Sequence, residues 1–138
     1  MATDVIKRCL AAILAADVVF FGEAEQAVGW IEKAMLLDPS EAKRRAPHLG
    51  MANFAARQYQ QAIDAFKRSP KLGHMQRAVL AACHAEIGNK AAAEQEAARA
   101  LELKPDFAVA SELGRAPYQL DADAEHHHDA LLKAGFPA

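Results

Sequence analysis

The sequence predicts an all-α protein, and three observations lead to this fold class. Apolar residues make up 52% of the 138 residues, and alanine, the residue with the highest helix propensity, occurs along the whole chain. Apolar residues recur at intervals of three and four, the period of an amphipathic helix, and no stretch alternates strictly as a half-buried strand would. Prolines and glycines interrupt this pattern at points where helices can end or begin. The pattern predicts helices over residues 4–21, 23–37, 41–56, 59–69, 74–87, 90–103, 106–115 and 121–134.

Length and charge restrict the function classes. A chain of 138 residues has the size of a single domain, and no apolar run approaches the roughly 20 residues of a membrane span. The net charge of −2 argues against a general nucleic-acid binder, which is usually basic. Residues 43–77 nevertheless contain eight Lys or Arg and one acidic residue, so the rest of the chain carries −9. This basic region is either a solvated surface or a patch for an acidic partner or for head-to-tail self-association.

The N-terminal region and the cysteines indicate a cytoplasmic protein. Two basic residues precede an apolar run over residues 9–16, which resembles a secretory signal, but Asp17 interrupts this run. Cys9 and Cys83 both lie in apolar helical patterns without metal-ligating neighbours, so we expect them to be reduced, buried thiols.

Three blocks of the sequence align on one another. The second predicted helix of each block begins in a similar way, and the similar strings end in Ala27, Ala62 and Ala93, which are 35 and 31 residues apart. The first and third blocks also end alike, in a charged residue followed by proline at positions 39 and 105. Proline stops a helix and directs the chain onward. Such a period indicates an internal helical repeat.

These blocks resemble the tetratricopeptide repeat (TPR), in which two antiparallel helices cross closely. The crossing requires small residues, and the pairs at the matching positions are Ala15 with Ala27, Gly50 with Ala62, and Ala81 with Ala93. The resemblance implies a TPR-like right-handed α-α superhelix of about three helix pairs within a single domain, 1–138. The expected repeats are about 8–40, 42–72 and 74–105, followed by C-terminal capping helices over 106–138.

Two further stretches resemble one group of bacterial class III adenylate/guanylate cyclases, which often carry TPR tails. The segment 10–19 resembles the start of their catalytic domain, and Asp17 stands at the place of a metal-binding aspartate. Residues 116–137 resemble the end of their TPR tails. The family's second metal-binding aspartate and its purine-selecting and transition-state residues have no counterpart here, and one carboxylate cannot hold two metal ions. The resemblance therefore implies a cyclase-derived chain that has lost the catalytic middle and is linked to cyclase signalling without being an enzyme.

No motif in the sequence predicts catalytic residues, a cofactor or a metal site. The three consecutive histidines at 126–128 point about 100° apart on a helix, and Glu125 with His128 forms only a single Glu-x-x-His pair. We expect a polar helix face there, with one histidine packed against the cap. Cys83 and His84 also diverge, and no third residue orients the imidazole, so we expect no nucleophilic catalysis.

The function that the TPR resemblance implies is protein–protein interaction, with a partner helix or peptide bound in an apolar concave groove. The first helix of each repeat lines that groove, and methionine and aromatic side chains suit adaptable contacts. The candidate groove residues are Phe20, Arg44, His48, Met51, Phe54 and Met75, with Arg44 as the charged anchor.

Three alternatives remain open from the residues alone. In the first, Phe20 and Phe54 belong to the core or are covered by the chain's own C-terminal helix. In the second, the chain is a self-associating, homodimeric regulatory module whose apolar first helix forms the interface. In the third, the chain is a cyclase remnant that retains metal or nucleotide binding through Asp17.

Overall fold

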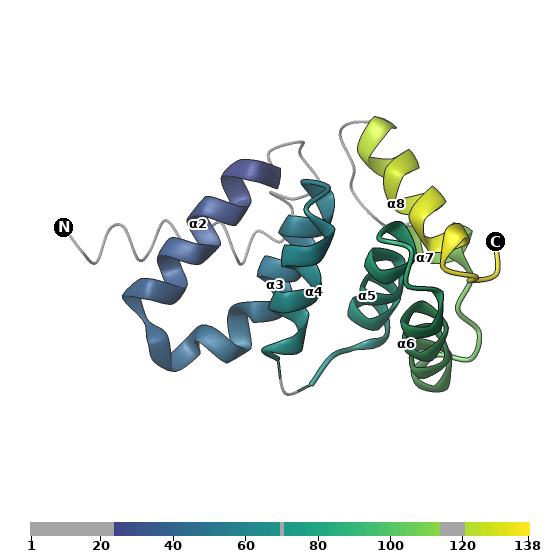
Figure 1. Cartoon of the computed structure of the whole chain (residues 1–138), viewed down its shortest axis with the longest axis horizontal. Helices are drawn as coiled ribbons and strands as arrows, with labels where there is room; N and C mark the ends of the chain where they lie inside the picture. Colours follow the sequence, from purple (N-terminus) through teal and green to yellow (C-terminus); the bar gives the residue numbers. More distant parts are fainter. Residues whose placement is uncertain (1–23, 70, 114–120) are drawn as a thin grey trace.

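The computed structural model describes residues 24–69, 71–113 and 121–138, and every regular element in these ranges is a helix (Figure 1). The all-α class is therefore confirmed for the described part of the chain. The predicted helix over residues 4–21 lies outside the described residues, as do Ala15 and Asp17. The elements are α2 (Ala24–Leu37), the 3-10 turn η2 (Pro39–Glu41), α3 (Ala42–Ala55), α4 (Tyr59–Lys67), α5 (His74–Glu86), α6 (Lys90–Leu103), α7 (Val109–Leu113) and α8 (Asp121–Lys133).

The helix boundaries agree closely with those predicted from the sequence, except at α7. The helix expected over 106–115 begins only at Val109, because the backbone N–H of Phe107 donates to the Lys104 carbonyl and forms a turn after α6. The N–H of Val109 then donates to the carbonyl of Pro137 over 2.8 Å. The start of α7 is thus fixed by the C-terminal segment, which a local sequence pattern does not reveal.

Consecutive helices pack on one another from α2 to α6, and α3 also contacts α5. α3 approaches α4 closely at Gly50, where an added Cβ would lie 2.7 Å from ring carbons of the fully buried Phe66. Ala62 of α4 is also fully buried. The close approach requires glycine at position 50, even though glycine costs a helix interior about 1 kcal/mol relative to alanine.

The described residues form two apolar clusters. The larger one spans α3 to α8 and contains the buried side chains of Phe54, Phe66, Val79, Phe107 and Leu131. The smaller one joins α2 to α3 and α4, and its members are mostly alanines. Its larger members are Ile31 and Leu49.

The C-terminal helices pack back onto the stack. α8 contacts α5 and α7 and also touches α3, and α2 and α8 lie toward opposite ends of the described structure (Figure 1). The rings of Phe107 and Phe136, whose centroids are 4.7 Å apart, join the segment before α7 to the segment after α8. Each helix from α3 onward therefore contributes residues to one core that it shares with the C-terminal end.

Candidate functional site

The candidate groove residues differ widely in exposure. Phe20 lies outside the described residues. Arg44, His48, Met51 and Phe54 recur at intervals of three and four along α3, so they follow one side of that helix. Arg44 is exposed, with 85% of its side-chain surface accessible, whereas His48 and Met51 are half-buried. Met75, in the first turn of α5, is half-buried against the larger core cluster. We call the surface of α3 and α5 that carries these residues the α3–α5 face.

Phe54 is a core residue in this structure, and the expectation that it contacts a partner directly needs correction. Its side chain is 2% exposed. Its ring stacks on His126, with centroids 4.7 Å apart, and meets His127 edge-on at 5.3 Å. The alternative that the C-terminal helix covers Phe54 is the one that the structure shows, because α8 brings both imidazoles to that position.

Two histidines of the 126–128 run pack into the protein. Only one packed histidine was predicted from the sequence. His126 Nε2 is hydrogen-bonded to Tyr59 Oη over 2.7 Å, and His127 is 2% exposed. Burial, followed by the nearby His126, lowers the pKa of His127 to about 3, so its imidazole is neutral at pH 7. His128 lies partly exposed beside Asp129, with Nδ1 3.2 Å from Oδ1. Within the described ranges, no group of three or more His, Cys, Asp or Glu side chains could hold a metal ion.

A pocket of about 440 Å³ opens between the first half of α3 and the loop that leads into α5. Two of the candidate groove residues, Arg44 and His48, line this pocket, and Gln76 of α5 lies on its other side. We call it the basic pocket. Its lining residues are Ser40, Lys43, Arg44, Pro47, His48, Ser69, Lys71 and Gln76.

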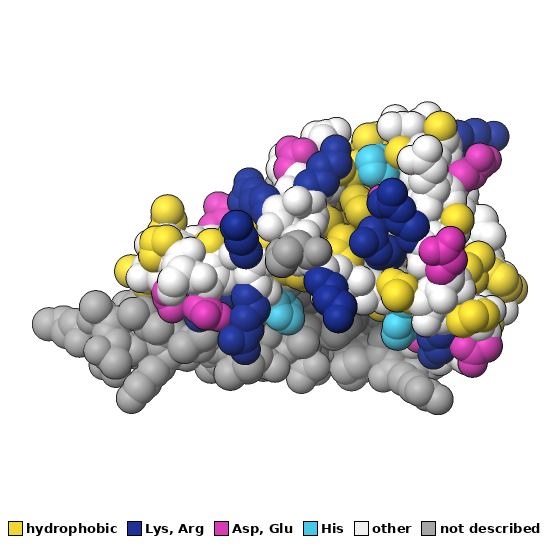
Figure 2. Space-filling model, turned by 90° about the horizontal axis from the view of Figure 1, so that it is seen from below, with side chains coloured by type: hydrophobic (Ala, Val, Ile, Leu, Met, Phe, Trp, Pro, Cys, Tyr) yellow, Lys and Arg dark blue, Asp and Glu magenta, His cyan; other side chains and the backbone are white. Residues whose placement is uncertain are grey.

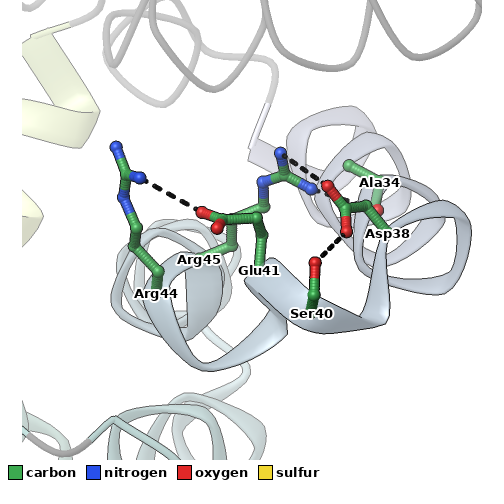
Figure 3. Close-up of polar contacts among 6 residues, drawn as sticks. All are labelled: Ala34, Asp38, Ser40, Glu41, Arg44 and Arg45. Atoms are coloured by element: carbon green, nitrogen blue, oxygen red, sulfur yellow. Dashed lines mark hydrogen bonds and ion pairs between the residues drawn. The ribbon is translucent and has the colours of Figure 1, made fainter.

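Arg44 and Arg45 are adjacent in the sequence beside this pocket but form different contacts (Figure 3). Arg45 is buried, donates a hydrogen bond to the carbonyl of Ala34 and approaches the Asp38 carboxylate to 4.0 Å, so it holds the start of α3 to the end of α2. Arg44 instead forms an exposed ion pair with Glu41, with a separation of 3.2 Å. Such an exposed pair contributes about 0–1 kcal/mol, so Arg44 can exchange it for another carboxylate.

Basic side chains predominate over acidic ones among the described residues that line the basic pocket. Burial, and then the charge of Arg44, lower the pKa of His48 below its usual value. Among the described residues, neither the Lys43 nor the Lys71 ammonium group has a carboxylate within ion-pair distance. Figure 2 shows Lys and Arg side chains spread over the middle of one face, with acidic side chains mainly toward its edges.

Six of the eight lining residues were not among the candidate residues predicted from the sequence, although the basic region 43–77 was identified there. Lys71 and Ser69 come from the loop before α5, and Gln76 from the first turn of that helix. The sequence signal for this part of the pocket was the excess of basic residues in the region 43–77. The proximity of that loop to α3 is a tertiary relationship that the pattern does not contain.

A second pocket, of about 390 Å³, lies between α2 and α4 over α3. Its lining combines acidic, basic, amide and apolar side chains, and Leu36 at its edge is 81% exposed. No charge of one sign dominates this lining, so the pocket does not indicate a ligand of defined chemistry. The lining residues are Glu32, Met35, Leu36, Leu49, Asn53, Gln61, Asp64 and Arg68.

Comparison with known proteins identifies no relative. No family model matches the chain, and no curated protein and no solved structure matches it. The TPR and cyclase-tail resemblances therefore stay predictions. No helix in the described part of the chain is long and apolar enough to cross a membrane.

Proposed function

We propose that this chain is a non-catalytic protein-interaction module with a TPR-like right-handed superhelix, about three helix pairs and a C-terminal cap over residues 106–138. The partner is a helix or peptide of another protein that binds on the α3–α5 face. The observation that carries this proposal is the basic pocket, because Arg44 and His48 of α3 and Gln76 of α5 line one cavity on that face. The sequential packing of α2 to α6 and the close crossing at Gly50 support the repeat architecture.

The partner binds to the part of the face that α8 leaves open. Phe54 is covered by His126 and His127, so the contacts available to a partner are Arg44, His48, and the half-buried Met51 and Met75. This arrangement makes the groove more polar than the sequence alone suggests. A link to cyclase signalling and a cytoplasmic location remain part of the proposal.

The environment of Cys83 supports a non-catalytic role. Its side chain is fully buried, and burial together with the charge of Glu86 raises the pKa of its thiol. A thiol in such surroundings stays protonated at neutral pH, whereas a nucleophilic cysteine must be a thiolate.

The experiment that tests the proposal compares capture of partners by two charge-reversal variants. Arg44→Glu changes the α3–α5 face, and Arg99→Glu is the matched control. Like Arg44, Arg99 forms an exposed i,i+3 ion pair with a glutamate, in its case Glu96 at 3.2 Å on α6. Partners cross-linked in native lysate are identified, purified and titrated against each variant by calorimetry.

We expect the affinity of a true partner to fall about fivefold or more in Arg44→Glu and to change less than twofold in Arg99→Glu, since one charge pair becomes repulsive. A partner whose affinity is equal for both variants binds elsewhere and contradicts the proposed face. Circular dichroism and thermal unfolding verify that both variants are folded.

Self-association is the second candidate, and the exposed apolar side chains of α2 favour it. Leu36 is 81% exposed, Leu37 41% and Trp30 39%, and exposed apolar groups of this kind mark interfaces. The native mass of the wild type and of Leu36→Lys tests this candidate. A dimer that becomes a monomer in the variant supports self-association through α2, and a monomeric wild type excludes it.

A further inference from the structure

We propose that the basic pocket binds carboxylate side chains of an acidic segment in the partner protein. This inference names the chemistry of the partner and rests on the proposed function as an interaction module. It is carried by the side chains that line the pocket, by the way the loop before α5 is held, and by the distribution of charge over the rest of the chain.

The described residues that line the pocket supply cations and no acidic side chain. Lys43 and Arg44 come from the first turn of α3, and Lys71 comes from the loop across the pocket. Gln76 accepts a hydrogen bond from the Gly73 N–H through its Oε1 at 2.8 Å, which leaves its amide NH₂ group for an incoming acceptor. Lys, Arg and amide N–H groups are the donors that recognise carboxylates, and charge-assisted hydrogen bonds are the stronger ones.

The hydroxyl groups of the two serines that line the pocket form hydrogen bonds within the protein. The hydroxyl of Ser40 donates to the Asp38 carboxylate over 2.5 Å, and the hydroxyl of Ser69 donates to the carbonyl of Lys71 over 3.0 Å. Ser69 thus fixes the backbone of the residue that carries the loop's ammonium group. Leu72, next in the chain, is 7% exposed and anchors the loop in the core. The backbone at Lys71 is therefore held beside the pocket before any partner arrives, which lowers the entropic cost of binding.

Charge outside the basic region favours a short acidic peptide over a nucleic acid. Residues 43–77 carry +7 and the rest of the chain carries −9. A long polyanion that extends beyond the basic region meets repulsion, whereas a short acidic segment does not. A volume of about 440 Å³ also suits one or two side chains rather than a polymer backbone.

The test measures binding of a fluorescein-labelled octapeptide in which glutamate alternates with alanine. The same peptide with glutamine in place of glutamate is the ligand control. The protein is used as the full chain in three forms: wild type, Lys43→Glu/Lys71→Glu, and Lys33→Glu/Lys90→Glu. The last variant has the same net charge as the pocket variant, and its exposed lysines lie on α2 and α6, away from the pocket.

We expect the wild type and the Lys33→Glu/Lys90→Glu control to bind the glutamate peptide with affinities within twofold of each other. Binding by Lys43→Glu/Lys71→Glu falls about tenfold or more, because two attractive contacts become repulsive. The glutamine peptide binds none of the three forms. The affinity of the wild type also falls as salt is raised from 50 to 200 mM.

His48 provides a second measurement at the pocket. Burial, and after it the charge of Arg44, lower the pKa of this imidazole, and a bound carboxylate offsets the contribution of Arg44. The pKa of His48 measured by NMR therefore rises when the glutamate peptide is added and stays constant with the glutamine peptide. A peptide that binds without moving the pKa of His48 occupies another surface and overturns the assignment.

The outcomes of the two experiments distinguish failure of the carboxylate assignment from failure of the proposed function. If the wild type does not bind the glutamate peptide but does bind a partner captured on the α3–α5 face, only the carboxylate assignment fails. Tighter binding of a single-stranded oligonucleotide of equal charge, lost in Lys43→Glu/Lys71→Glu, overturns the choice of a peptide. If instead the peptide binds the pocket but Arg44→Glu captures every partner normally, the carboxylate site stands and the proposed interaction face fails.

Discussion

The imidazole of His126 stacks on the ring of Phe54, with 4.7 Å between the ring centroids, and so joins α8 to α3. The same imidazole is hydrogen-bonded through Nε2 to Tyr59 Oη over 2.7 Å. One side chain thus links the end of α3, the start of α4 and the C-terminal helix. The neighbouring His127 is buried against the same phenyl ring.

The first prediction concerns the pH dependence of folding at His127. Its pKa is lowered from 6.5 to about 3 in the folded protein, so the unfolded chain takes up the proton first as the pH falls. The stability that the neutral imidazole provides is complete above about pH 6.5 and is lost as the pH decreases toward 3. We expect the free energy of unfolding in urea to fall by about 1.4 kcal/mol per pH unit below pH 6 on account of this residue.

The variant His127→Leu isolates this contribution. Burial also lowers the pKa values of His48 and His84, so the free energy of unfolding of the variant still depends on pH. The slope of this free energy against pH is smaller in the variant by the contribution of His127. Equal slopes for wild type and variant between pH 6 and 5 would show that His127 is not buried in neutral form.

The second prediction concerns the hydrogen bond between Tyr59 and His126. Tyr59→Phe removes the hydroxyl and keeps the ring, so the loss is confined to this bond. We expect a decrease of about 0.5–1.5 kcal/mol in the free energy of unfolding and faster amide hydrogen exchange in α8. Exchange that accelerates equally in α6 would indicate a general rather than a local effect.

The third prediction compares two glycines within helices. At Gly50 an added Cβ lies 2.7 Å from the Phe66 ring, so Gly50→Ala forces the ring or the helix to move and costs about 1–3 kcal/mol. At Gly29, in α2, nothing lies within 4 Å of an added Cβ. Gly29→Ala therefore stabilises the protein by about 0.5–1 kcal/mol through helix propensity. Chemical denaturation measures the change in the free energy of unfolding for both variants. A change of the same sign in the two variants would refute the close crossing of α3 and α4.

The fourth prediction concerns the segment that follows α8. Phe136 is 4% exposed against Phe107, whereas Leu132 is 37% exposed on the same C-terminal part of the chain. Phe136→Ala should lower the free energy of unfolding by about 3–5 kcal/mol, and Leu132→Ala by about a quarter of that or less. Thermal unfolding measures the two, and a Phe136→Ala variant as stable as the wild type contradicts the packing of this segment.

Much of the helical framework follows from local sequence signals. Gly88 has a positive φ of 84° after α5, and Pro39 begins the 3-10 turn after α2, so both act where the chain must leave a helix. The TPR resemblance predicted a small residue at position 50 opposite Ala62, and in the structure a Cβ added at Gly50 would meet the ring of Phe66. These features depend on neighbours in the sequence or on one crossing between adjacent helices.

The position of α8 against α3 and the set of residues that line the basic pocket could not be predicted from local sequence signals. Phe54 lies on the same side of α3 as Met51, and nothing local distinguishes a ring that contacts a partner from one that His126 covers. Lys71 reaches the pocket because Leu72 anchors the loop in the core. Both outcomes depend on packing between elements that are distant in the chain, where periodicity carries no information.

The division of the described residues into two apolar clusters has a consequence for local unfolding. The cluster that holds α2 consists mainly of alanines around Ile31 and Leu49, so its opening exposes little apolar surface. The cluster around Phe66 and Leu131 combines large side chains from α3 to α8 and opens only with the cooperative unit as a whole. The amides of α2 therefore exchange through sub-global openings whose free energy is lower than that of the openings that expose the amides of α5. Proteases that cleave transiently open chains act first at the α2 end of the described structure.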